Sequence, residues 1–246
     1  MNIILINPNT TKTMTASMYE SVLPFLSKGV NLKALTAPFG VPSIEGYYDE
    51  AFAIQPIIEV IIPIADEIDG VVIGCFDDTG VQALRTILDV PVVGICQAAM
   101  QAASVVSNQF SVITTLHRSV PAIQKLAAEY GFRDICKRVR ASEVPVLDLE
   151  NNEKHALNLI EKEVDNALKQ DLAEAIVLGC AGMSKLSHLL TKKYNVPIID
   201  GVGAAVKLVE GLATLGIKTS SRGGYSRPQH KRYSGTLKKY SPKAFK

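Results

Sequence analysis

Short apolar runs alternate with longer amphipathic segments along most of the chain. Each apolar run is rich in Val, Ile and Leu and is bounded by turn residues, which is typical of a buried parallel strand. The predicted strands are Ile3–Ile6, Leu32–Thr36, Val71–Gly74, Val92–Ile95, Phe110–Thr114, Val139–Pro145, Ile176–Gly179 and Pro197–Ile199. Helical periodicity falls between them, near residues 11–27, 47–66, 79–88, 97–106, 118–130, 152–169, 184–194 and 203–215. This alternation predicts an α/β fold in which helices cover both faces of parallel sheets.

Two stretches of the chain repeat the same order of residues. In the first, a buried strand ends in glycine and Cys75, and a proline follows 16 residues after the cysteine. In the second, a strand ends in glycine and Cys180, and the proline follows after 17 residues. The second residue of an alanine pair comes 24 and 25 residues after the respective cysteine. Agreement in order, spacing and residue type indicates two related halves.

We therefore predict two pseudo-symmetric lobes, each a parallel-sheet α/β sandwich, with the active site in the cleft between them. The predicted first lobe comprises residues 1–97 and 203–218, the second lobe comprises residues 98–202, and residues 219–246 form a flexible basic tail. Each lobe carries a polar strand end, at Asn7 and at Thr114, and later a cysteine strand end. Carboxyl ends of parallel strands are where open α/β sheets bind ligands.

The matched cysteines are the first candidates for chemistry. A thiol at a strand end before a helix is favoured as thiolate by the helix dipole, whereas the carboxylates of Asp77 and Asp78 oppose ionisation of Cys75. One of these aspartates is expected to cap the helix that follows, as is Ser184 after Cys180. A single cysteine is commonly an inert core residue. Two thiols at equivalent strand ends instead suggest removal and return of a proton.

Polar loops at the same sheet edge are candidates for binding. Asn7-Pro8-Asn9-Thr10 offers amide and hydroxyl donors, although helix capping would explain part of that pattern. The loop at residues 41–46 contains Ser43 and Glu45, which could equally be solvated residues of a helix-entry turn.

Other site classes have little support. Cys96 and Cys136 have no symmetric twins, and the histidines and cysteines have no zinc-like spacing, so no metal is expected. Gly201-Val-Gly203-Ala-Ala-Val206 resembles a dinucleotide fingerprint only superficially, because valine occupies the third glycine position. His117 lies at a helix start, where a structural role is common.

Charge is distributed unevenly along the 246 residues. The net charge is +2, but residues 219–246 contain eight Lys or Arg and no acid, so residues 1–218 carry 18 basic and 24 acidic side chains, a net of −6. The tail could be a solvated extension or make weak contact with an acidic surface. No apolar run is long enough to span a membrane and no signal peptide is recognised, so a cytoplasmic location is expected. Nucleic acid is not expected as the main ligand.

Five motifs together resemble a known family. They are Ile6-Asn7-Pro8-Asn9-Thr10, Val41-Pro42-Ser43-Ile44-Glu45-Gly46, the paired Gly-Cys strand ends, Cys75-Phe76-Asp77-Asp78 and Gly179-Cys180-Ala181-Gly182-Met183. In this order they resemble the hydantoin and allantoin racemase branch of the aspartate/glutamate racemase superfamily. The resemblance covers roughly residues 1–217 and leaves out the basic tail.

The resemblance implies a cofactor-independent, homo-oligomeric racemase with a small-molecule substrate. It implies that Cys75 and Cys180 act as an acid/base pair on opposite faces of C5 of a hydantoin or allantoin ring. The implied substrate-binding residues are Asn7, Ser43, Ile44, Phe76, Asp77, Thr114, Thr115, Ala181 and Gly182. Relatives that act on free amino acids usually carry polar pairs after the cysteines, whereas Phe76-Asp77 and Ala181-Gly182 fit a neutral ring better.

Two alternatives stay open at this level. One is another isomerase or a decarboxylase of the same superfamily, such as an amino-acid racemase or a cis-trans isomerase; a decarboxylase needs only one of the two thiols. The other is a two-lobed small-molecule binder in which the cysteines are incidental. Loss of both thiols would leave ligand affinity intact in a binder and abolish turnover in a racemase.

Overall fold

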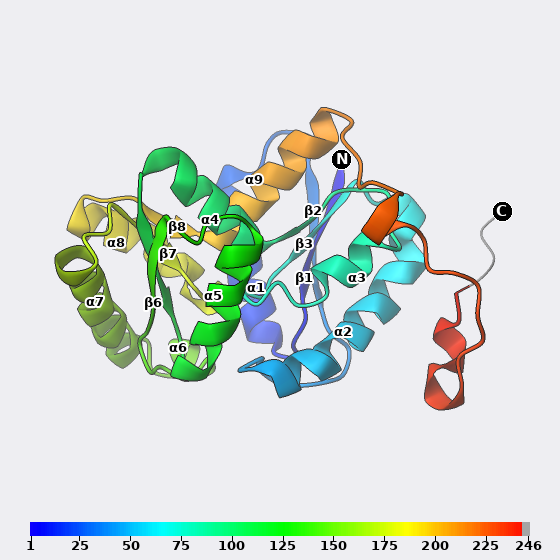
Figure 1. Ribbon diagram of the computed structural model, residues 1–246, viewed down its shortest axis with the longest axis horizontal. Helices are drawn as coiled ribbons and strands as arrows, with labels where there is room; N and C mark the ends of the chain where they lie inside the picture. Colours follow the sequence, from blue (N-terminus) through cyan, green and yellow to red (C-terminus); the bar gives the residue numbers. More distant parts are fainter. Residues whose placement is uncertain (243–246) are drawn as a thin grey trace.

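Two parallel sheets of four strands form the framework of the protein. The computed structural model describes residues 1–242 and confirms the predicted α/β class (Figure 1). The first sheet has the order β2-β1-β3-β4, with β1 at Asn2–Asn7, β2 at Asn31–Thr36, β3 at Gly70–Ile73 and β4 at Val92–Gly94. The second has the order β6-β5-β7-β8, with β5 at Phe110–Thr114, β6 at Cys136–Ala141, β7 at Ala175–Leu178 and β8 at Ile198–Asp200. The two sheets have the same strand order, which agrees with the repeat seen in the sequence.

Helices follow the strands in both halves. The α-helices are α1 Lys12–Val22, α2 Tyr47–Ile61, α3 Val81–Arg85, α4 Ile95–Val106, α5 Val120–Glu129, α6 Asp148–Asn151, α7 Glu153–Gln170, α8 Ser187–Tyr194 and α9 Gly201–Thr214. Short 3₁₀ helices are η1 Leu23–Phe25, η2 Ile62–Glu67, η3 His117–Ser119, η4 Ala181–Leu186, η5 Gly223–Tyr225 and η6 Gly235–Tyr240. Prolines at the starts of η1 and η2 end two of the predicted helices earlier than the periodicity indicates.

Strand β6 differs most from its prediction. It begins at Cys136 rather than Val139 and ends at Ala141, before the predicted end at Pro145. It is an edge strand, and the register with β5 shifts between Phe110 and Ser111. Its exposed charged residues hide the alternation that marks a strand, as is common at sheet edges.

Helices α4 and α9 join the two halves at the centre of the molecule. They pack against each other, and buried Ala98, Ala99 and Ala205 belong to a hydrophobic core shared by both sheets. A side chain at Gly201 would come within 2.5 Å of the Ile95 carbonyl oxygen, so glycine is needed where the helix starts meet. The alanine pairs of the sequence repeat are therefore explained by close helix packing.

A carboxylate caps each of these two helices: Asp78 is buried and Asp200 is partly buried. Asp78 accepts hydrogen bonds from Cys96 N at 2.9 Å and Gln97 N at 3.0 Å at the start of α4. Asp200 accepts from the backbone N–H groups of the second and third residues of α9. Gly94 is the structural equivalent of Asp200, and a Cβ at Gly94 would lie 2.1 Å from the Asp78 carboxyl carbon. Both halves thus have a carboxylate at the start of the central helix. In the first half it comes from the loop after Cys75, and in the second it comes from the end of β8.

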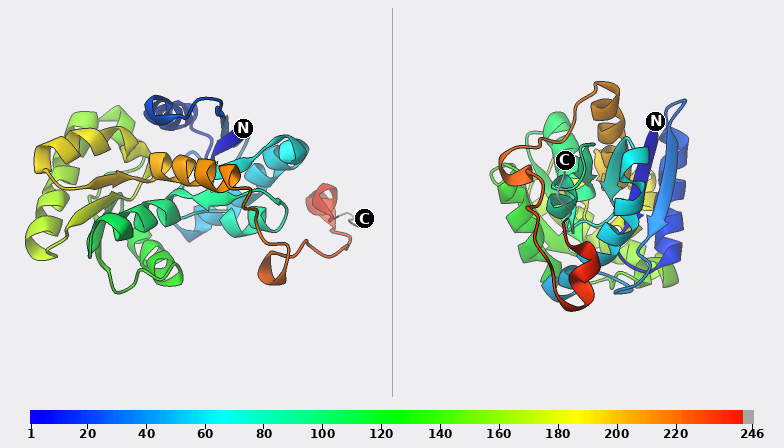
Figure 2. Two further views of the ribbon diagram at one scale, coloured as in Figure 1. Left: turned by 90° about the horizontal axis from the view of Figure 1, so that it is seen from above. Right: turned by 90° about the vertical axis from the view of Figure 1, so that its right-hand side faces the viewer.

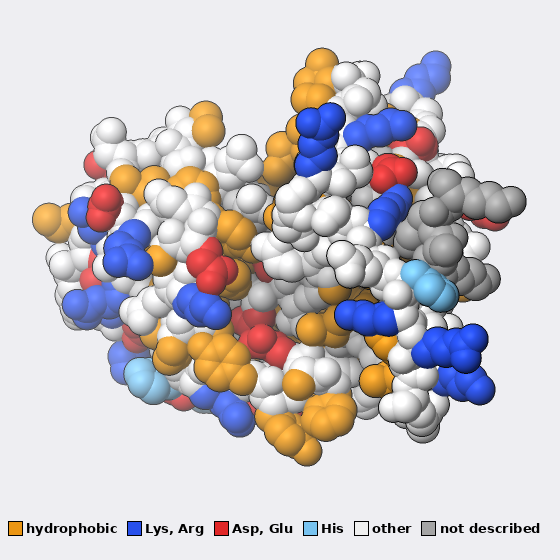
Figure 3. Space-filling model, turned by 45° about the vertical axis from the view of Figure 1, so that its right-hand side comes forward, with side chains coloured by type: hydrophobic (Ala, Val, Ile, Leu, Met, Phe, Trp, Pro, Cys, Tyr) orange, Lys and Arg blue, Asp and Glu red, His pale blue; other side chains and the backbone are white. Residues whose placement is uncertain are grey.

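The described part of the basic tail lies against the first sheet's helices. Figures 1 and 2 show it running along the outer side of that half, and Figure 3 shows basic side chains gathered on this side. Its contacts are Thr219 N to Asp89 O at 2.8 Å, Tyr225 to Gln82 at 2.8 Å, Arg227 to Asp89 at 2.6 Å and Lys239 to Glu59 at 2.9 Å. The domain boundaries and the tail's flexibility stay predictions. Within residues 1–242, no helix has the length and apolarity required to cross a membrane.

Replacing Gly94 by alanine tests the role of the cap on α4. The added methyl group would displace the Asp78 carboxylate and leave two buried N–H groups without acceptors. We expect the free energy of unfolding to fall by about 2–4 kcal/mol. Urea denaturation measures this loss. The matched control is Gly211→Ala in α9, where nothing lies within 4 Å of the added Cβ and helix propensity predicts no loss. Equal stability of the two variants would contradict the role given to Asp78.

Candidate active site

The cysteine strand ends of the two halves meet in one pocket. In each sheet the strand before the cysteine pairs with the first strand of that half, so the two carboxyl ends lie side by side. The residues around the pocket are Asn9, Met14, Ile44, Gly74, Cys75, Phe76, Asp77, Thr114, Thr115, Ser119, Val146, Gly179, Cys180 and Ala181. Both predicted catalytic residues and six of the nine predicted binding residues are therefore brought together.

Burial dominates the electrostatics of Cys75. It raises the pKa of the Cys75 thiol well above its ordinary value, and the negative charge of Asp77 raises it further. A backbone hydrogen bond from Asp77 and the Thr79 hydroxyl, 3.6 Å from the sulfur, act in the opposite direction. Helix α3 starts only at Val81, so Cys75 does not lie directly at a helix start as its sequence context had suggested. Cys180 directly precedes η4.

The two aspartates after Cys75 point to different places. Asp77 lines the pocket, whereas Asp78 has a φ of 50° and caps α4. The expectation that an aspartate here caps the next helix was wrong, because the capped helix follows the next strand. Burial raises the pKa of Asp78 to about 6, against hydrogen bonds from Tyr130 and two backbone N–H groups. Asp78 therefore connects the Cys75 loop to the centre of the molecule.

Ser184 connects the loop after Cys180 to the start of α9. Its hydroxyl donates to Asp200 at 2.6 Å and is also within 2.8 Å of the Ala181 carbonyl oxygen. Ser184 was expected to cap its own helix; it instead contacts the carboxylate that caps α9. Both cysteine loops are thus attached to the starts of the two central helices.

Three predicted binding residues do not line the pocket. The amide of Asn7 is fully buried and donates to Asn9, Thr15 and the Thr11 carbonyl oxygen. It therefore holds the loop that brings Asn9 to the wall. Gly182 lies beside Cys180, and a Cβ there would come within 2.8 Å of Leu149.

The third is Ser43, whose hydroxyl donates to Glu45 at 3.2 Å. The same carboxylate accepts a hydrogen bond of 3.3 Å from Val146 N, so the loop at residues 41–46 reaches the opposite half of the protein. Ile44, between these two residues, is buried in the pocket wall. The loop thus closes one side of the pocket.

The sequence motifs missed several wall residues. Thr114 and Thr115 were predicted, but the Thr114 hydroxyl is engaged by the Gly179 carbonyl oxygen at 3.1 Å. Ser119 and Val146 were not predicted, because they belong to a short 3₁₀ helix and to an irregular segment without a recognisable pattern. Among the missed wall residues, only Asn9 could have been predicted, because it belongs to the polar motif at the end of the first strand.

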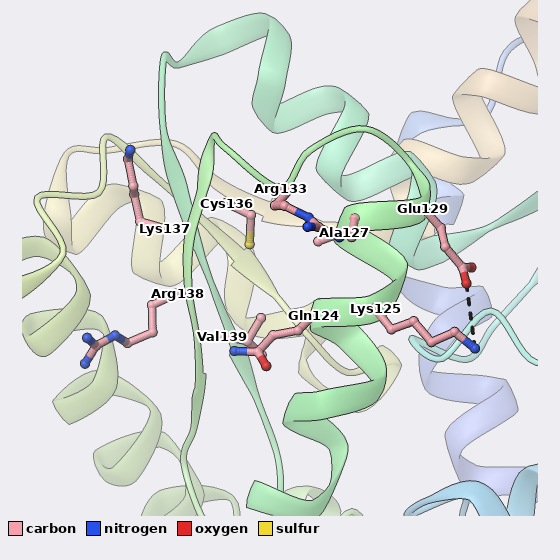
Figure 4. A pocket seen from close by; sticks show the side chains of 10 residues that line it. Gln124, Lys125, Ala127, Glu129, Arg133, Cys136, Lys137, Arg138 and Val139 are labelled. Atoms are coloured by element: carbon pink, nitrogen blue, oxygen red, sulfur yellow. Dashed lines mark ion pairs between the residues drawn. The ribbon is translucent and has the colours of Figure 1, made fainter.

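A larger groove elsewhere contains none of the predicted site residues. It lies on the second half between α5 and β6, with Lys125, Arg133, Lys137 and Arg138 at its edges and Cys136 on the strand (Figure 4). Burial raises the pKa of the Cys136 thiol to about 12. Within residues 1–242, no three His, Cys, Asp or Glu side chains are arranged to hold a metal ion.

Comparison with known proteins agrees with this architecture. Residues 3–209 match the family model for Asp/Glu/Hydantoin racemase. The chain is 46% identical to a hydantoin racemase of Rhizobium meliloti over 96% of its own length and 98% of that protein. Among solved structures, allantoin racemase from Klebsiella pneumoniae has a TM-score of 0.94 at 40% identity, covering 98% of this chain and 99% of that one. Allantoin racemase from Pseudomonas fluorescens has a TM-score of 0.92 at 34% identity, covering 96% and 100%.

The fold and these matches define an isomerase of the racemase class. The chain belongs to the Asp/Glu/Hydantoin racemase family. The hydantoin and allantoin racemase branch indicated by the five motifs is confirmed. Its extent was underestimated, because matches covering 96–98% of the chain include most of the basic tail.

The ionisation of Asp77 makes stability depend on pH. Burial, followed by the charges of Glu50 and Asp78, raises the pKa of Asp77 to about 7 in the folded chain. Protonated Asp77 therefore makes its full contribution to the free energy of unfolding below the pKa of the unfolded chain, near 4. This contribution is lost as the pH rises through 7. The Asp77→Asn variant cannot ionise, so the unfolding free energy of the wild type relative to this variant should fall by about 2–4 kcal/mol from pH 4 to 8. Urea denaturation across this range measures it; exposed Asp66→Asn is the control, and a flat difference for Asp77→Asn would refute the burial argument.

Proposed function

We propose that this protein racemises 5-substituted hydantoins or allantoin at ring carbon C5, without a cofactor or metal, and that Cys75 and Cys180 are its two bases. The supporting observation is that these two thiols, from equivalent strand ends of the two halves, line one pocket. They are close enough for the charge of Cys180 to affect the pKa of Cys75. The names of the similar proteins support the same substrate class.

Each turnover moves one proton off the ring and one proton onto it. One cysteine, as thiolate, takes the C5 proton, and the electron pair of the C–H bond becomes the enolate of the neighbouring carbonyl. The other cysteine, as thiol, donates its proton to the opposite face of C5 and becomes the thiolate. The opposite enantiomer uses the same pair in exchanged roles. Acid/base catalysis of this kind contributes about 10²–10⁴-fold per group.

Hydroxyl groups in the wall can stabilise the enolate. Thr115 and Ser119 are buried beside the pocket, and neither side-chain hydroxyl makes a hydrogen bond within residues 1–242. Such donors lower the barrier most when they face the atom where negative charge develops. We therefore assign them, rather than Thr114, to the ring carbonyl and ring nitrogen atoms.

The composition of the wall favours a neutral ring over a free amino acid. Its side chains include one carboxylate and no Lys or Arg, so an α-carboxylate would meet no cation. Met14, Ile44, Phe76 and Val146 supply apolar surface for the ring faces and its substituent.

Entry of such a substrate requires the pocket to open. The space between the wall residues is about 40 Å³, which suits water rather than a ligand of ordinary size, since ligand pockets are typically about 300–1,000 Å³. The loop at residues 41–46 is held across the pocket by Glu45 and Val146 through one hydrogen bond of 3.3 Å. Breaking this bond would release the loop from the second half, so we propose that the ring enters here.

Optical rotation during incubation with L- and D-5-substituted hydantoins and with allantoin tests the proposal. We expect the signal of at least one of these substrates to decay to zero from either enantiomer, with no effect of chelators. Stable rotation across the whole panel would refute the activity.

Single cysteine variants test the two-base mechanism. Cys75→Ser and Cys180→Ser should each reduce racemisation at least about 10²-fold, while each retains exchange of the C5 hydrogen with deuterated solvent for only one enantiomer. NMR follows that exchange. Cys136→Ser, remote from the pocket, is the matched control and should stay active. If both variants lose exchange of both enantiomers equally, the assignment of one thiol to each face fails.

A further inference from the structure

A buried hydroxyl faces the sulfur atom of Cys75. Thr79 follows Cys75 by four residues and is 4% exposed, and its Oγ1 lies 3.6 Å from the Cys75 Sγ, within hydrogen-bond range of the large sulfur atom. Within residues 1–242 this sulfur is the sole hydrogen-bond partner of the Thr79 hydroxyl. A buried polar group without a partner loses its hydration and gains nothing in return, so such groups are nearly always paired. The Thr79 hydroxyl therefore depends on the Cys75 sulfur.

The backbone around Thr79 fixes this contact. Asp78 and Gly80, on either side of Thr79, have φ values of 50° and 87°, in the left-handed region. The Asp78 N–H donates to the Cys75 carbonyl oxygen at 3.0 Å, so the chain turns back directly after the cysteine. The Asp78 carboxylate holds this turn in place, because it accepts hydrogen bonds from two N–H groups of α4 and from the Tyr130 hydroxyl at 2.7 Å. Thr79 is not a helix cap, since α3 begins after Gly80 and has no side-chain cap.

The second half has a hydroxyl at the same position but uses it differently. Ser184 also follows its cysteine, Cys180, by four residues. Its hydroxyl donates at 2.6 Å to Asp200, the carboxylate that caps α9. The first half caps α4 with Asp78, which belongs to the cysteine loop itself. The hydroxyl of Thr79 is therefore left to contact the sulfur.

The contact favours one charge state of Cys75. A hydroxyl can accept a hydrogen bond from a thiol or donate one to a thiolate. The second bond is the stronger, because hydrogen bonds to ionised groups are about twice as strong as those between neutral groups. Burial and the nearby charge of Asp77 act against the thiolate. Thr79 supplies a side-chain hydrogen bond that acts for it.

We propose that Thr79 is a positioning residue of this racemase: its hydroxyl donates a hydrogen bond to the Cys75 thiolate and so stabilises the form of Cys75 that acts as a base. The inference rests on the proposed function for its catalytic meaning, since Cys75 is assigned there as one of the two bases. Thr79 loses no proton during turnover; when Cys75 is protonated, the hydroxyl turns to accept from the thiol. The effect is confined to the first half, because Ser184 is engaged by Asp200.

The rate of Cys75 alkylation tests the contact without substrate. Thr79→Val keeps the shape of the side chain and removes the hydroxyl. We expect iodoacetamide to label Cys75 about three- to tenfold more slowly at pH 8 in this variant, because a smaller fraction of the sulfur is ionised and the thiolate is the nucleophile. Thr79→Ser retains the hydroxyl and should label within about twofold of the wild type. Peptide mass spectrometry follows Cys75 separately from the other thiols.

Two controls separate the hydroxyl from general effects. Thr86→Val removes a hydroxyl that bonds the Ala83 carbonyl oxygen at 2.7 Å at the end of α3, and should leave Cys75 labelling unchanged. Cys136 on β6, outside the pocket, should label equally in every variant. Unchanged Cys75 labelling in Thr79→Val overturns the proposal, as does an equal slowing in Thr79→Ser. If Thr79→Val does not fold, as judged by circular dichroism, Thr79→Ala replaces it under the same criteria.

Exchange of the C5 hydrogen with deuterated solvent tests the catalytic meaning of the contact. In Cys180→Ser protein the exchange depends on Cys75, and adding Thr79→Val should slow it about three- to tenfold further. In Cys75→Ser protein the exchange depends on Cys180, and Thr79→Val should have no effect. No slowing in the first protein, or equal slowing in both, overturns the proposal. If the wild type exchanges no substrate of the panel, the proposed function fails, while the labelling result still decides whether Thr79 acts on Cys75.

Discussion

The packing of α4 against α9 is the contact on which the rest of the structure depends. These helices follow equivalent strands, share one hydrophobic core with both sheets, and approach closely because Ala98, Ala99 and Ala205 have small side chains. Their starts are capped by Asp78 and Asp200, which are attached to the loops that follow the two cysteines. Each cap satisfies backbone N–H groups that would otherwise be buried without acceptors. The same contact that joins the halves therefore also sets the distance between the two thiols.

The environment of Cys75 illustrates why a site of this kind cannot be optimised for stability alone. The half-buried Cys75 thiol, the half-buried Asp77 and the buried, helix-capping Asp78 lie within one short segment, and desolvation raises the pKa of all three. Each of these groups is more costly to ionise here than in water.

Much of the fold and part of the site could be predicted from the sequence. Strands and helices follow apolar periodicity, and the repeat of glycine-cysteine, proline and alanine reports equivalent positions directly, so the two halves and the two thiols are visible without coordinates. Tertiary partners are not encoded in such local patterns. No spacing rule could show that Asp78 caps a helix beyond the next strand, or that Ser119 and Val146 reach the wall. The edge strand β6 was misplaced because charged residues interrupt its alternation.

The symmetry of the backbone is not matched by the chemistry around the two sulfur atoms. The first half takes its helix cap from the cysteine loop, so acidic Asp77 and Asp78 follow Cys75, whereas the second takes its cap from Asp200 at a strand end and leaves small Ala181 and Gly182 after Cys180. The two thiols of the proposed acid/base pair therefore lie in different electrostatic surroundings. A racemase interconverts molecules of equal free energy, so the ratio kcat/KM must be equal for both enantiomers, and unequal bases can be expressed only as matched differences in kcat and KM. Asymmetric surroundings are consequently compatible with racemisation, because the equilibrium constant fixes only the ratio of the forward and reverse kcat/KM values. It does not fix the pKa of either thiol.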